Sequence, residues 1–300
     1  MISDYFLLSI RNLRRRKLRS WLTIIGVFIG IAAIVAFITL GQGLENYINE
    51  QFEQLGSDLI MIMGKAGSVV SPIASEIAEK PLTQKDVDLI NKISGVKVAS
   101  AMIVKPTSIT FSKQTENLFL YGLEPKDIDE LFGNLESFKI DKGRQLKQED
   151  KYKAVIGSRF HEIFDKKISL GSKVEIYGKK FEIVGIMKPI GNPQDDMSIY
   201  IPNEVMRKLI NEPDKVSMIY VQTKEGLAKE VSEEIKKKMR KERHEKEGEE
   251  SFSVSTTEQL IETMGDILGV VQAVVVGIAS ISLLVGGIGI MNTMYTSVLE

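Results

Sequence analysis

The sequence predicts a membrane protein in which two transmembrane α-helices flank an α+β extracytoplasmic domain. Two long uncharged runs, from Trp21 to Leu40 and from Ile267 to Leu299, predict the helices. Between them the chain alternates strand and helix patterns and carries most of the charge, which is typical of a folded domain in water. The average composition, with 26% charged residues and a formal net charge of -1, conceals this division.

The first apolar run predicts a transmembrane helix over residues 21–43. Roughly 20 apolar residues in a helix cross the hydrocarbon core of a bilayer. A cleaved signal peptide is the alternative, because a basic segment followed by an apolar one fits both. The run exceeds the usual length of a signal peptide, and its exit "ITLGQGLENY" offers only a weak cleavage site. These observations favour an uncleaved anchor.

Basic residues predict the orientation of the chain. A cluster precedes the first span, whereas no Lys or Arg occurs from Gly41 to Gly64. Since lysine and arginine stay on the cytoplasmic side, residues 1–20 are predicted to be cytoplasmic and residues 44–265 extracytoplasmic. We expect the cluster to set topology and contact lipid headgroups at the plasma membrane, in an amphipathic segment on its inner face, rather than bind nucleic acid. The cluster consists of Arg11, Arg14, Arg15, Arg16, Lys17 and Arg19.

The second span, residues 266–299, is longer than a bilayer crossing requires. One end is therefore expected to extend outward as a stalk, together with the polar helical run from Leu44 to Leu55. Small residues in both spans permit close approach of neighbouring helices, and an amide among them must find a hydrogen-bond partner. The predicted helix-packing and mechanical-coupling residues are Gly26, Gly30, Gly286, Gly287, Gly289 and Asn292.

Two strand-helix-strand units are predicted to form the part of the domain near the membrane. The first helix carries Thr83 and Asp86 at the spacing of a capping box, and the second carries Leu227, Val231, Ile235 and Met239 on one face. The lysine and glutamate run after Leu227 is expected to be a solvated helix trailing into a mobile loop. The units comprise residues 58–63, 83–93 and 96–104, and residues 216–223, 227–239 and 251–256.

A strand-rich subdomain is predicted as an insertion over residues 107–200. "TSITFS", "NLFLYG" and "KAVIG" have strand patterns, and "SKVEIYGKKFEIVGIMK" predicts a hairpin turning at Gly178. Helices are predicted near Pro125 and from Ser158 through Phe164.

No catalytic, metal or cofactor site is predicted. Cysteine is absent, and His161 and His244 lie in separate predicted helices, which gives no zinc site or histidine-based triad. Asp195 and Asp196 are expected to be a solvated turn rather than an acid and base pair. No phosphate-binding glycine loop occurs, so ATP-driven work would require a separate polypeptide.

Four stretches carry a family resemblance. "RRRKLRSWLTIIGVFIGIAAIVAFITLGQGL" and "LLVGGIGIMNTMYTSVLE" resemble the first span and the second-span exit of MacB-type ABC transporter permeases, which include macrolide exporters, lipoprotein-releasing permeases and FtsX relatives. "AVIGSRFHEIFDKKISLGSKVEIYGKKFEIVGIMKPIG" and "IYIPNEVMRKL" are similar to the family's extracytoplasmic domain. The positions that match the family's span motifs are Gly26, Gly30, Gly287, Gly289, Met291 and Asn292.

The resemblance implies a permease subunit that works as a dimer and is driven by a cytoplasmic ATPase, which it couples mechanically to export or extraction of an amphiphilic substrate. In such permeases the glutamate matching Glu300 precedes a basic coupling segment and two further spans. The sequence is therefore expected to be the front part of a permease, either truncated or from a split gene. The alternative is a membrane-anchored, FtsX-like regulator that binds an extracytoplasmic partner. An anchored enzyme is the least favoured reading, because no catalytic constellation is visible.

Overall fold

The computed structural model describes residues 17–65, 80–133, 135 and 138–299. The chain divides into two compact units. One is helical and is formed from the described parts of residues 1–50 and 261–300. The other is a domain formed by residues 51–260.

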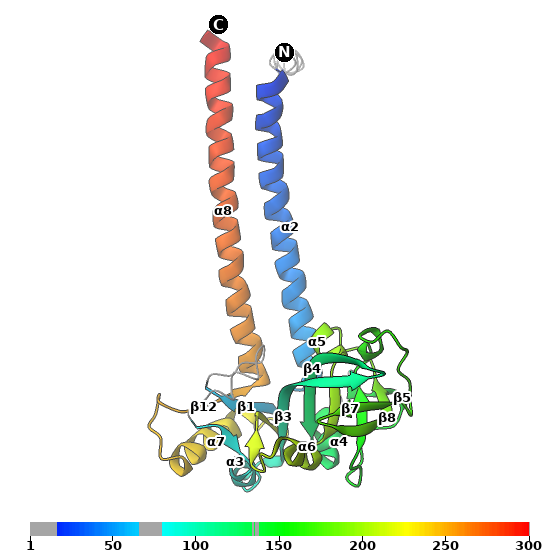
Figure 1. Ribbon diagram of the computed structural model, residues 1–300. Coiled ribbons are helices and arrows are strands. Elements are labelled where there is room, and N and C mark those ends of the chain that lie inside the picture. The colour runs from blue at the N-terminus through cyan, green and yellow to red at the C-terminus, as the bar shows by residue number, and fades with distance from the viewer. Residues whose placement is uncertain (1–16, 66–79, 134, 136–137, 300) are drawn as a thin grey trace. The chain divides into compact units, whose positions relative to one another are not determined.

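Two long helices build the helical unit, α2 (Lys17–Leu55) and α8 (Thr257–Leu299). They run antiparallel, so that Lys17 and Leu299 lie at the same end of the pair (Figure 1). The segments Phe28–Glu50 and Thr257–Gly289 are long and apolar enough to cross a membrane, and only 6% of each tested window is buried. A helix that is apolar on nearly all faces and exposed is suited to lipid or to other helices. These are the two candidate membrane helices that the sequence predicts.

Both predicted strand-helix-strand units are present in the domain. Their four strands lie in the order β12-β1-β11-β3, and every neighbouring pair is antiparallel. This is the βαββαβ arrangement known from ferredoxin-like folds. The elements are β1 (Leu59–Gly64), α3 (Gln84–Ile90), β3 (Val96–Phe111), β11 (Met218–Thr223), α7 (Ala228–Glu242) and β12 (Phe252–Thr256).

The four-stranded part of the sheet is buried on both faces. Side chains alternate along a strand, so Ile60 and Ile62 of β1 join a core with Ile90 of α3 and Ile235 of α7. Leu59, Met61 and Met63 join a second core that includes Phe132. Because α3 and α7 cover one face only, the second core needs cover from residues after β3.

Strands between β3 and β11 extend the sheet. The path continues β3-β4-β9-β6-β8-β5, and β7 pairs with both β3 and β8. A third core, which includes Phe160 and Phe181, fills this part. The strands are β4 (Gln114–Leu123), β5 (Ile140–Gly143), β6 (Lys153–Ile156), β7 (Lys173–Ile176), β8 (Lys179–Met187) and β9 (Ile199–Pro202).

Short elements complete the domain. Strands β2 (Leu82–Thr83) and β10 (Lys215–Val216) form a separate two-stranded sheet. The helices are η2 (Pro125–Asp127), α4 (Ile128–Phe132), η4 (Phe160–Glu162), α5 (Pro193–Asp196) and α6 (Asn203–Ile210).

Two local predictions differ from the structure. The strands predicted on either side of Pro106 form the single strand β3, which pairs with β11 up to Met102 and with β7 only from Ile109. At Pro106 the strand is therefore paired on one side only, where a missing N–H is tolerated. The helix predicted from Ser158 is only the short η4, because the Ser158 hydroxyl donates to Asp196 Oδ1 at 3.0 Å instead of capping.

The predicted hairpin at Gly178 is confirmed. Strands β7 and β8 pair antiparallel, with Tyr177 at φ 48° and Gly178 at φ 70° between them. Positive φ at both central residues is the type I′ geometry that matches the right-handed twist of the strands.

Candidate functional site

The candidate site is the contact between the two membrane helices. A Cβ added to Gly30 would lie 3.5 Å from Leu283 Cδ2, and one added to Gly41 would lie 2.3 Å from Gln272 Nε2. Gly30 and Gly41 are as far apart in sequence as Gln272 and Leu283. The two contacts therefore belong to one antiparallel register over about three helical turns.

Small side chains occupy the same line of contact. Ala279 of α8 is only 7% exposed, although most of its neighbours on α8 are open. Ala33 and Ile34 of α2 are half-buried at the corresponding level. Because Ala279 is small, the α2 backbone and the half-buried Ile34 can approach α8 at this level. The remaining faces of both helices expose large apolar side chains, including Phe28, Val35, Leu40, Val270, Ile278 and Leu284.

Three hydroxyl groups within the apolar segments donate to their own helix. Thr39 donates to Val35 O at 2.8 Å, and Ser280 donates to Val276 O at 2.7 Å. Ser282 donates in the same way to Ile278 O at 3.1 Å. Such local bonds remove the cost of placing a hydroxyl in an apolar environment.

Of the predicted packing residues, the structure places Gly30 in the α2–α8 contact. Gly30 lies against Leu283, whereas a Cβ added to Gly26, Gly287 or Gly289 would meet nothing within 4 Å. Gly286 is half-buried and Asn292 is exposed. Their predicted roles in packing and coupling stay predictions, and the free space beside Gly26 and Gly287 leaves room for another helix.

The predicted topology residues lie at the start of α2 or before it. Lys17 and Arg19 belong to the first turn of the helix. Arg11, Arg14, Arg15 and Arg16 lie outside the described residues. Their contact with the membrane surface also stays a prediction.

Two residues of the contact, Gly41 and Gln272, were missed by the sequence reasoning. Gln272 carries the one amide between Asp266 and Met291, which could have marked it as a special position. The sequence does not reveal which residue of α2 it faces, because that depends on the register of the two helices.

The interpretation of Asp195 and Asp196 as a solvated turn is wrong. Asp196 is 2% exposed, and its carboxylate accepts hydrogen bonds from the N–H groups of Ile190 at 2.8 Å and Gly191 at 3.1 Å, as well as from Ser158. Asp195 accepts from the Tyr121 hydroxyl at 3.0 Å. A buried carboxylate with several donors is a structural group that fixes a loop, here the loop between β8 and β9.

The environment of Asp195 also perturbs its titration. Burial raises the pKa of its carboxyl, and the nearby charge of Asp196 raises it further. Burial and the Asp195 charge likewise raise the pKa of Tyr121, whose ring stacks on that of Tyr200 with centroids 5.1 Å apart. Tyr220 is partly buried and packs against the same core. The cluster joins the loop to β4, β9 and β11.

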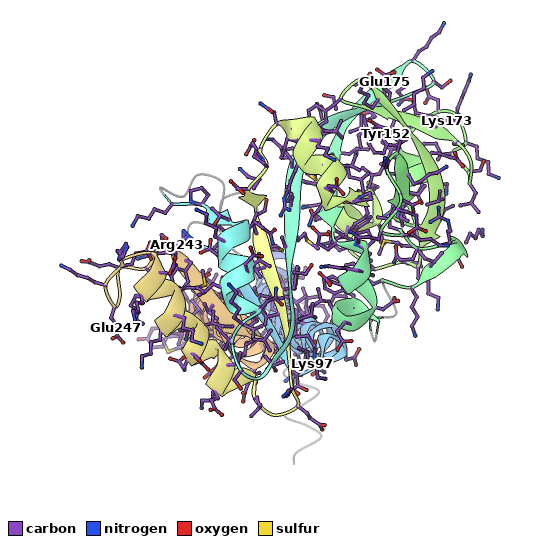
Figure 2. The ribbon with its side chains drawn as sticks, turned by 90° about the horizontal axis from the view of Figure 1, so that it is seen from below. Lys97, Tyr152, Lys173, Glu175, Arg243 and Glu247 are labelled. Carbon is purple, nitrogen blue, oxygen red and sulfur yellow. The ribbon has the colours of Figure 1, made fainter. Side chains whose placement is uncertain are left out.

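A nearly buried ionic cluster follows α7, where a mobile loop was expected. Arg243 Nη1 lies 3.0 Å from Asp86 Oδ2, and Arg243 Nε lies 3.6 Å from Glu245 Oε1. Their side chains are 9%, 6% and 5% exposed. Arg243 also donates to the carbonyls of Lys80 and Pro81. Figure 2 shows Arg243 at the end of α7 beside α3, with Glu247 further out.

Charge interactions in this cluster favour the ionised carboxylate. Burial alone would raise the pKa of Glu245, but hydrogen bonds from Ser251 and the charge of Arg243 hold it below its ordinary value. Asp86 also accepts hydrogen bonds from the Thr83 N–H at 2.7 Å and from its hydroxyl. The residue predicted to cap α3 therefore also anchors the end of α7.

A cleft of about 310 Å³ lies between the loop before β6 and helix α6. Its lining mixes carboxylates and ammonium groups over an apolar floor, so charge favours neither an anionic nor a cationic ligand. Its lining includes Glu124, Pro125, Tyr152, Lys179, Val205 and Lys208.

Over the described ranges, no group of three or more His, Asp or Glu side chains could hold a metal ion. His161 lies in η4, with Nδ1 2.9 Å from Ser158 O. His244 lies in the turn after α7 rather than in a helix. The two histidines therefore belong to different parts of the domain.

Comparison with known proteins identifies the family. Residues 20–238 match the family model described as the MacB-like periplasmic core domain. The chain therefore belongs to the MacB-like family of ABC transporter permeases, as the resemblance implied. An uncharacterized ABC transporter permease of Methanocaldococcus jannaschii is 38% identical over 301 residues, covering 100% of this chain and 73% of the relative.

Other relatives have related names. The uncharacterized ABC transporter permease YknZ of Bacillus subtilis is 26% identical over 300 residues, which cover 98% of this chain and 74% of YknZ. The macrolide export ATP-binding/permease protein MacB of Pasteurella multocida is 29% identical, and the match covers 98% of this chain but only 45% of MacB.

Solved structures confirm the fold of the domain. The periplasmic region of MacB from Actinobacillus actinomycetemcomitans matches with a TM-score of 0.57 and 16% identity, covering 73% of this chain and 97% of that one. The extracellular domain of YknZ matches with a TM-score of 0.51 and 20% identity, covering 66% and 100%. The predicted fold class, two membrane helices flanking an α+β domain of MacB-like fold, is confirmed.

Proposed function

We propose that the chain is a permease subunit of a MacB-type ABC transporter, which transmits the movement of a separate cytoplasmic ATPase to its α+β domain. The observation that carries this proposal is the antiparallel contact of α2 and α8, the two helices between which the whole domain is encoded. Because α2 precedes the domain in sequence and α8 follows it, a shift of one helix along the other would act on both ends of the domain's chain. Membership in a family of ABC transporter permeases supports the same role.

The proposed orientation places the N-terminus in the cytoplasm and residues 44–265 outside. It is supported by the arginine-rich segment before α2 and by the absence of Lys and Arg between Gly41 and Gly64. The periplasmic and extracellular domains named among the similar structures are in accord with it.

The proposed partners are lipid, a second permease subunit and an ATPase. The apolar faces of α2 and α8, with exposed side chains such as Phe28 and Leu284, require a cover of lipid or further helices. The MacB relatives are named ATP-binding/permease proteins, which supports an ATPase as a partner of this permease. We infer that nucleotide binding is supplied by another subunit and that the cargo is an amphiphilic molecule.

In this mechanism ATP binding draws the cytoplasmic helix ends of two subunits together. The helices then carry the movement to the two domains, which change between two discrete arrangements. Energy is transmitted through packed helices, so substrate need not pass between them.

Glycine substitution tests the proposal. The chain is purified from membranes together with its ATPase, and Gly287→Leu or Gly289→Leu is compared with Val285→Leu, a change at an exposed apolar position. Dimerisation and substrate-stimulated ATP hydrolysis should fall for the glycine variants and persist in the control. Unchanged dimerisation and hydrolysis in the glycine variants would contradict the packing role.

A second measurement separates a transporter from a regulator. Reconstituted vesicles are supplied with ATP and a panel of amphiphiles, and hydrolysis and substrate movement are followed together. Stimulated hydrolysis with movement supports transport. Binding of an envelope protein to the domain, without movement of any substrate, would instead support the regulator.

A further inference from the structure

The Gln272 side chain fills the space in which residue 41 would carry a Cβ. A Cβ added to Gly41 would lie 2.3 Å from Gln272 Nε2, 2.8 Å from Cδ and 3.0 Å from Cγ. Separations below 3.0 Å are closer than nonbonded carbon atoms tolerate. The end of the side chain therefore lies directly against the α2 backbone, in a gap that only glycine leaves.

This close approach is specific to one glycine of the segment. A Cβ added to Gly43 or Gly26 of the same helix would meet nothing within 4 Å. The Gly30 and Leu283 contact, at 3.5 Å, is ordinary packing. Gly41 is thus the position at which a side chain of α8 lies directly against the α2 backbone.

Gln272 is suited to mark a position along the helix. It is the one amide between Asp266 and Met291 of α8, and it is half-buried among exposed valines. The hydroxyls of Ser280 and Ser282 donate to carbonyls of their own helix, so their hydrogen bonds do not depend on the position of α2. A bulky polar side chain opposite a glycine defines one register, because a shift by a turn would press it against a residue with a Cβ.

We propose that Gln272 and Gly41 form a register pin, in which the amide side chain seated at Gly41 fixes the position of α8 along α2. Gln272 is a positioning residue. That the pinned register also governs coupling to ATP hydrolysis rests on the proposed function, whereas the pin itself does not.

The test uses disulfide cross-linking in membranes, for which the natural chain is suited because it contains no cysteine. Counting inward from the two contacts places Ile34 of α2 opposite Ala279 of α8. The pair Ile34→Cys with Ala279→Cys should cross-link faster than Ile34→Cys with Val275→Cys, which reports α8 shifted by one turn. The ratio of the two cross-linking rates measures the register without any assay of activity.

The variants are Gly41→Leu, Gln272→Ala and the double variant that combines them. Gly41→Leu should lower the rate ratio by about threefold to tenfold, the range that pairwise contacts between membrane helices produce. The double variant should restore it, because the space vacated by Gln272 accepts the leucine. Gly43→Leu is the matched control and should leave the ratio unchanged, since that position faces open space.

The smaller substitution Gly41→Ala distinguishes displacement of the Gln272 side chain from separation of the two helices. The contacting atoms are the flexible end of a side chain, so Gly41→Ala should displace the amide without separating the helices. Its expected effect is a smaller fall in the ratio than that of Gly41→Leu. An unchanged ratio in Gly41→Leu, or a fall that Gln272→Ala does not reverse, overturns the proposal.

The same variants keep the pin separate from the proposed function. Where the register shifts but stimulated ATP hydrolysis in the assembled complex does not change, the pin stands and its link to coupling fails. Where register and hydrolysis change together and recover together in the double variant, both are supported.

Discussion

Two adjacent aspartates in the loop before β9 have different environments although their sequence context is the same. Asp196 is buried and accepts hydrogen bonds from several donors, whereas Asp195 is partly buried and accepts one from Tyr121, whose ring stacks on that of Tyr200. The difference arises because α5 turns one carboxylate inward and the other toward the aromatic core. Substitutions at the two residues are therefore expected to affect stability in different ways.

Asp196→Ala should destabilise the domain. The substitution leaves the N–H groups of Ile190 and Gly191 and the Ser158 hydroxyl without their acceptor. Loss of a buried acceptor costs about 1–3 kcal/mol in the free energy of unfolding. Thermal unfolding of the detergent-solubilised chain measures it, with Asp141→Ala, whose side chain is 52% exposed, as the control. Equal unfolding temperatures for the two variants would contradict the structural role.

Asp195→Asn should change how stability depends on pH. The pKa of Asp195 is raised by burial and by Asp196, so the folded state holds the proton more tightly than the unfolded chain. Its contribution to stability is present below the ordinary pKa of 3.8 and is lost as the pH rises through the folded pKa. The asparagine variant should therefore gain stability relative to the natural chain as the pH rises toward neutrality.

The pH slope is the decisive quantity in this comparison. The hydrogen bond that Asn192 donates to Asp195 lowers the pKa of Asp195 and is lost in the variant, but burial, the largest cause of the shift, leaves the pKa raised in the natural chain. Tyr121, Tyr200, Tyr220 and Asp196 face the same carboxyl and are unaltered in the variant. Parallel curves of unfolding free energy against pH for the two proteins would show that Asp195 titrates normally.

At the scale of elements, Arg243 connects residues 80–86 with residues 243–252, two stretches that are distant in sequence. It binds Asp86 at the start of α3, the carbonyls before β2 and Glu245 after α7, and its guanidinium lies 5.8 Å from the centre of the Phe252 ring at the start of β12. The two helices on this face of the sheet are thereby fixed at the same end.

Arg243→Ala should cost about 3–5 kcal/mol in the free energy of unfolding, because it takes the guanidinium from two nearly buried carboxylates and leaves Glu245 only the exposed Lys80 at 3.6 Å. The control is Arg159→Ala, whose partner Glu162 and own side chain are 43% and 45% exposed. An exposed pair contributes about 0–1 kcal/mol. Denaturant unfolding of both variants measures the contrast, and similar losses would show that the cluster is no stronger than a surface pair.

Gly95, which follows α3, has a conformation and surroundings that both require glycine. Its φ is +90°, and an added Cβ would lie 2.8 Å from Val231 Cγ2 of α7. Gly95→Ala should therefore lose about 2–4 kcal/mol, from left-handed strain and overpacking together. Gly226→Ala has a similar positive φ of +73° but open space, so it isolates the strain. Equal unfolding free energies for the two variants would exclude the steric part.

Local patterns were sufficient to predict most elements of the four-stranded part. Alternating apolar residues marked β1, and the i, i+4 stripe from Leu227 to Met239 marked the buried face of α7. Prediction failed where a tertiary contact overrode a local signal. Pro106 did not interrupt β3, since only one side of the strand is paired there, and Ser158 was diverted from capping by Asp196.

At the scale of the whole molecule, charge and hydropathy were sufficient to predict two membrane helices flanking an α+β domain. The sequence could not predict pairs such as Gly41 with Gln272 or Arg243 with Asp86. Each member has an ordinary local context, and the pairing depends on how distant segments come together. The small-residue motifs were visible in sequence, but which glycine faces α8 depends on helix register.

The last prediction concerns the side of the membrane on which the domain and the N-terminus lie. Single cysteines are introduced at Lys173 and Glu247, both exposed on the domain, and at Ser3 in the basic N-terminal segment, and a membrane-impermeant maleimide is applied to intact spheroplasts. The first two should be labelled at once and the third only after permeabilisation, because the arginine cluster holds the N-terminus in the cytoplasm. The natural chain, which has no cysteine, supplies the unlabelled control.

Replacing residues of the arginine cluster tests whether the cluster determines the orientation of the chain. Changing Arg14, Arg15 and Arg16 to glutamine removes half of the six basic residues before the first span, so a fraction of chains should invert and protect Lys173→Cys from label. Labelling of Ser3→Cys before permeabilisation in the otherwise natural chain would reverse the assigned orientation. In that reversed orientation the domain would be cytoplasmic and the N-terminal end of α2 would lie outside. A cytoplasmic ATPase could then not contact those helix ends, and mechanical coupling through α2 and α8 would be excluded.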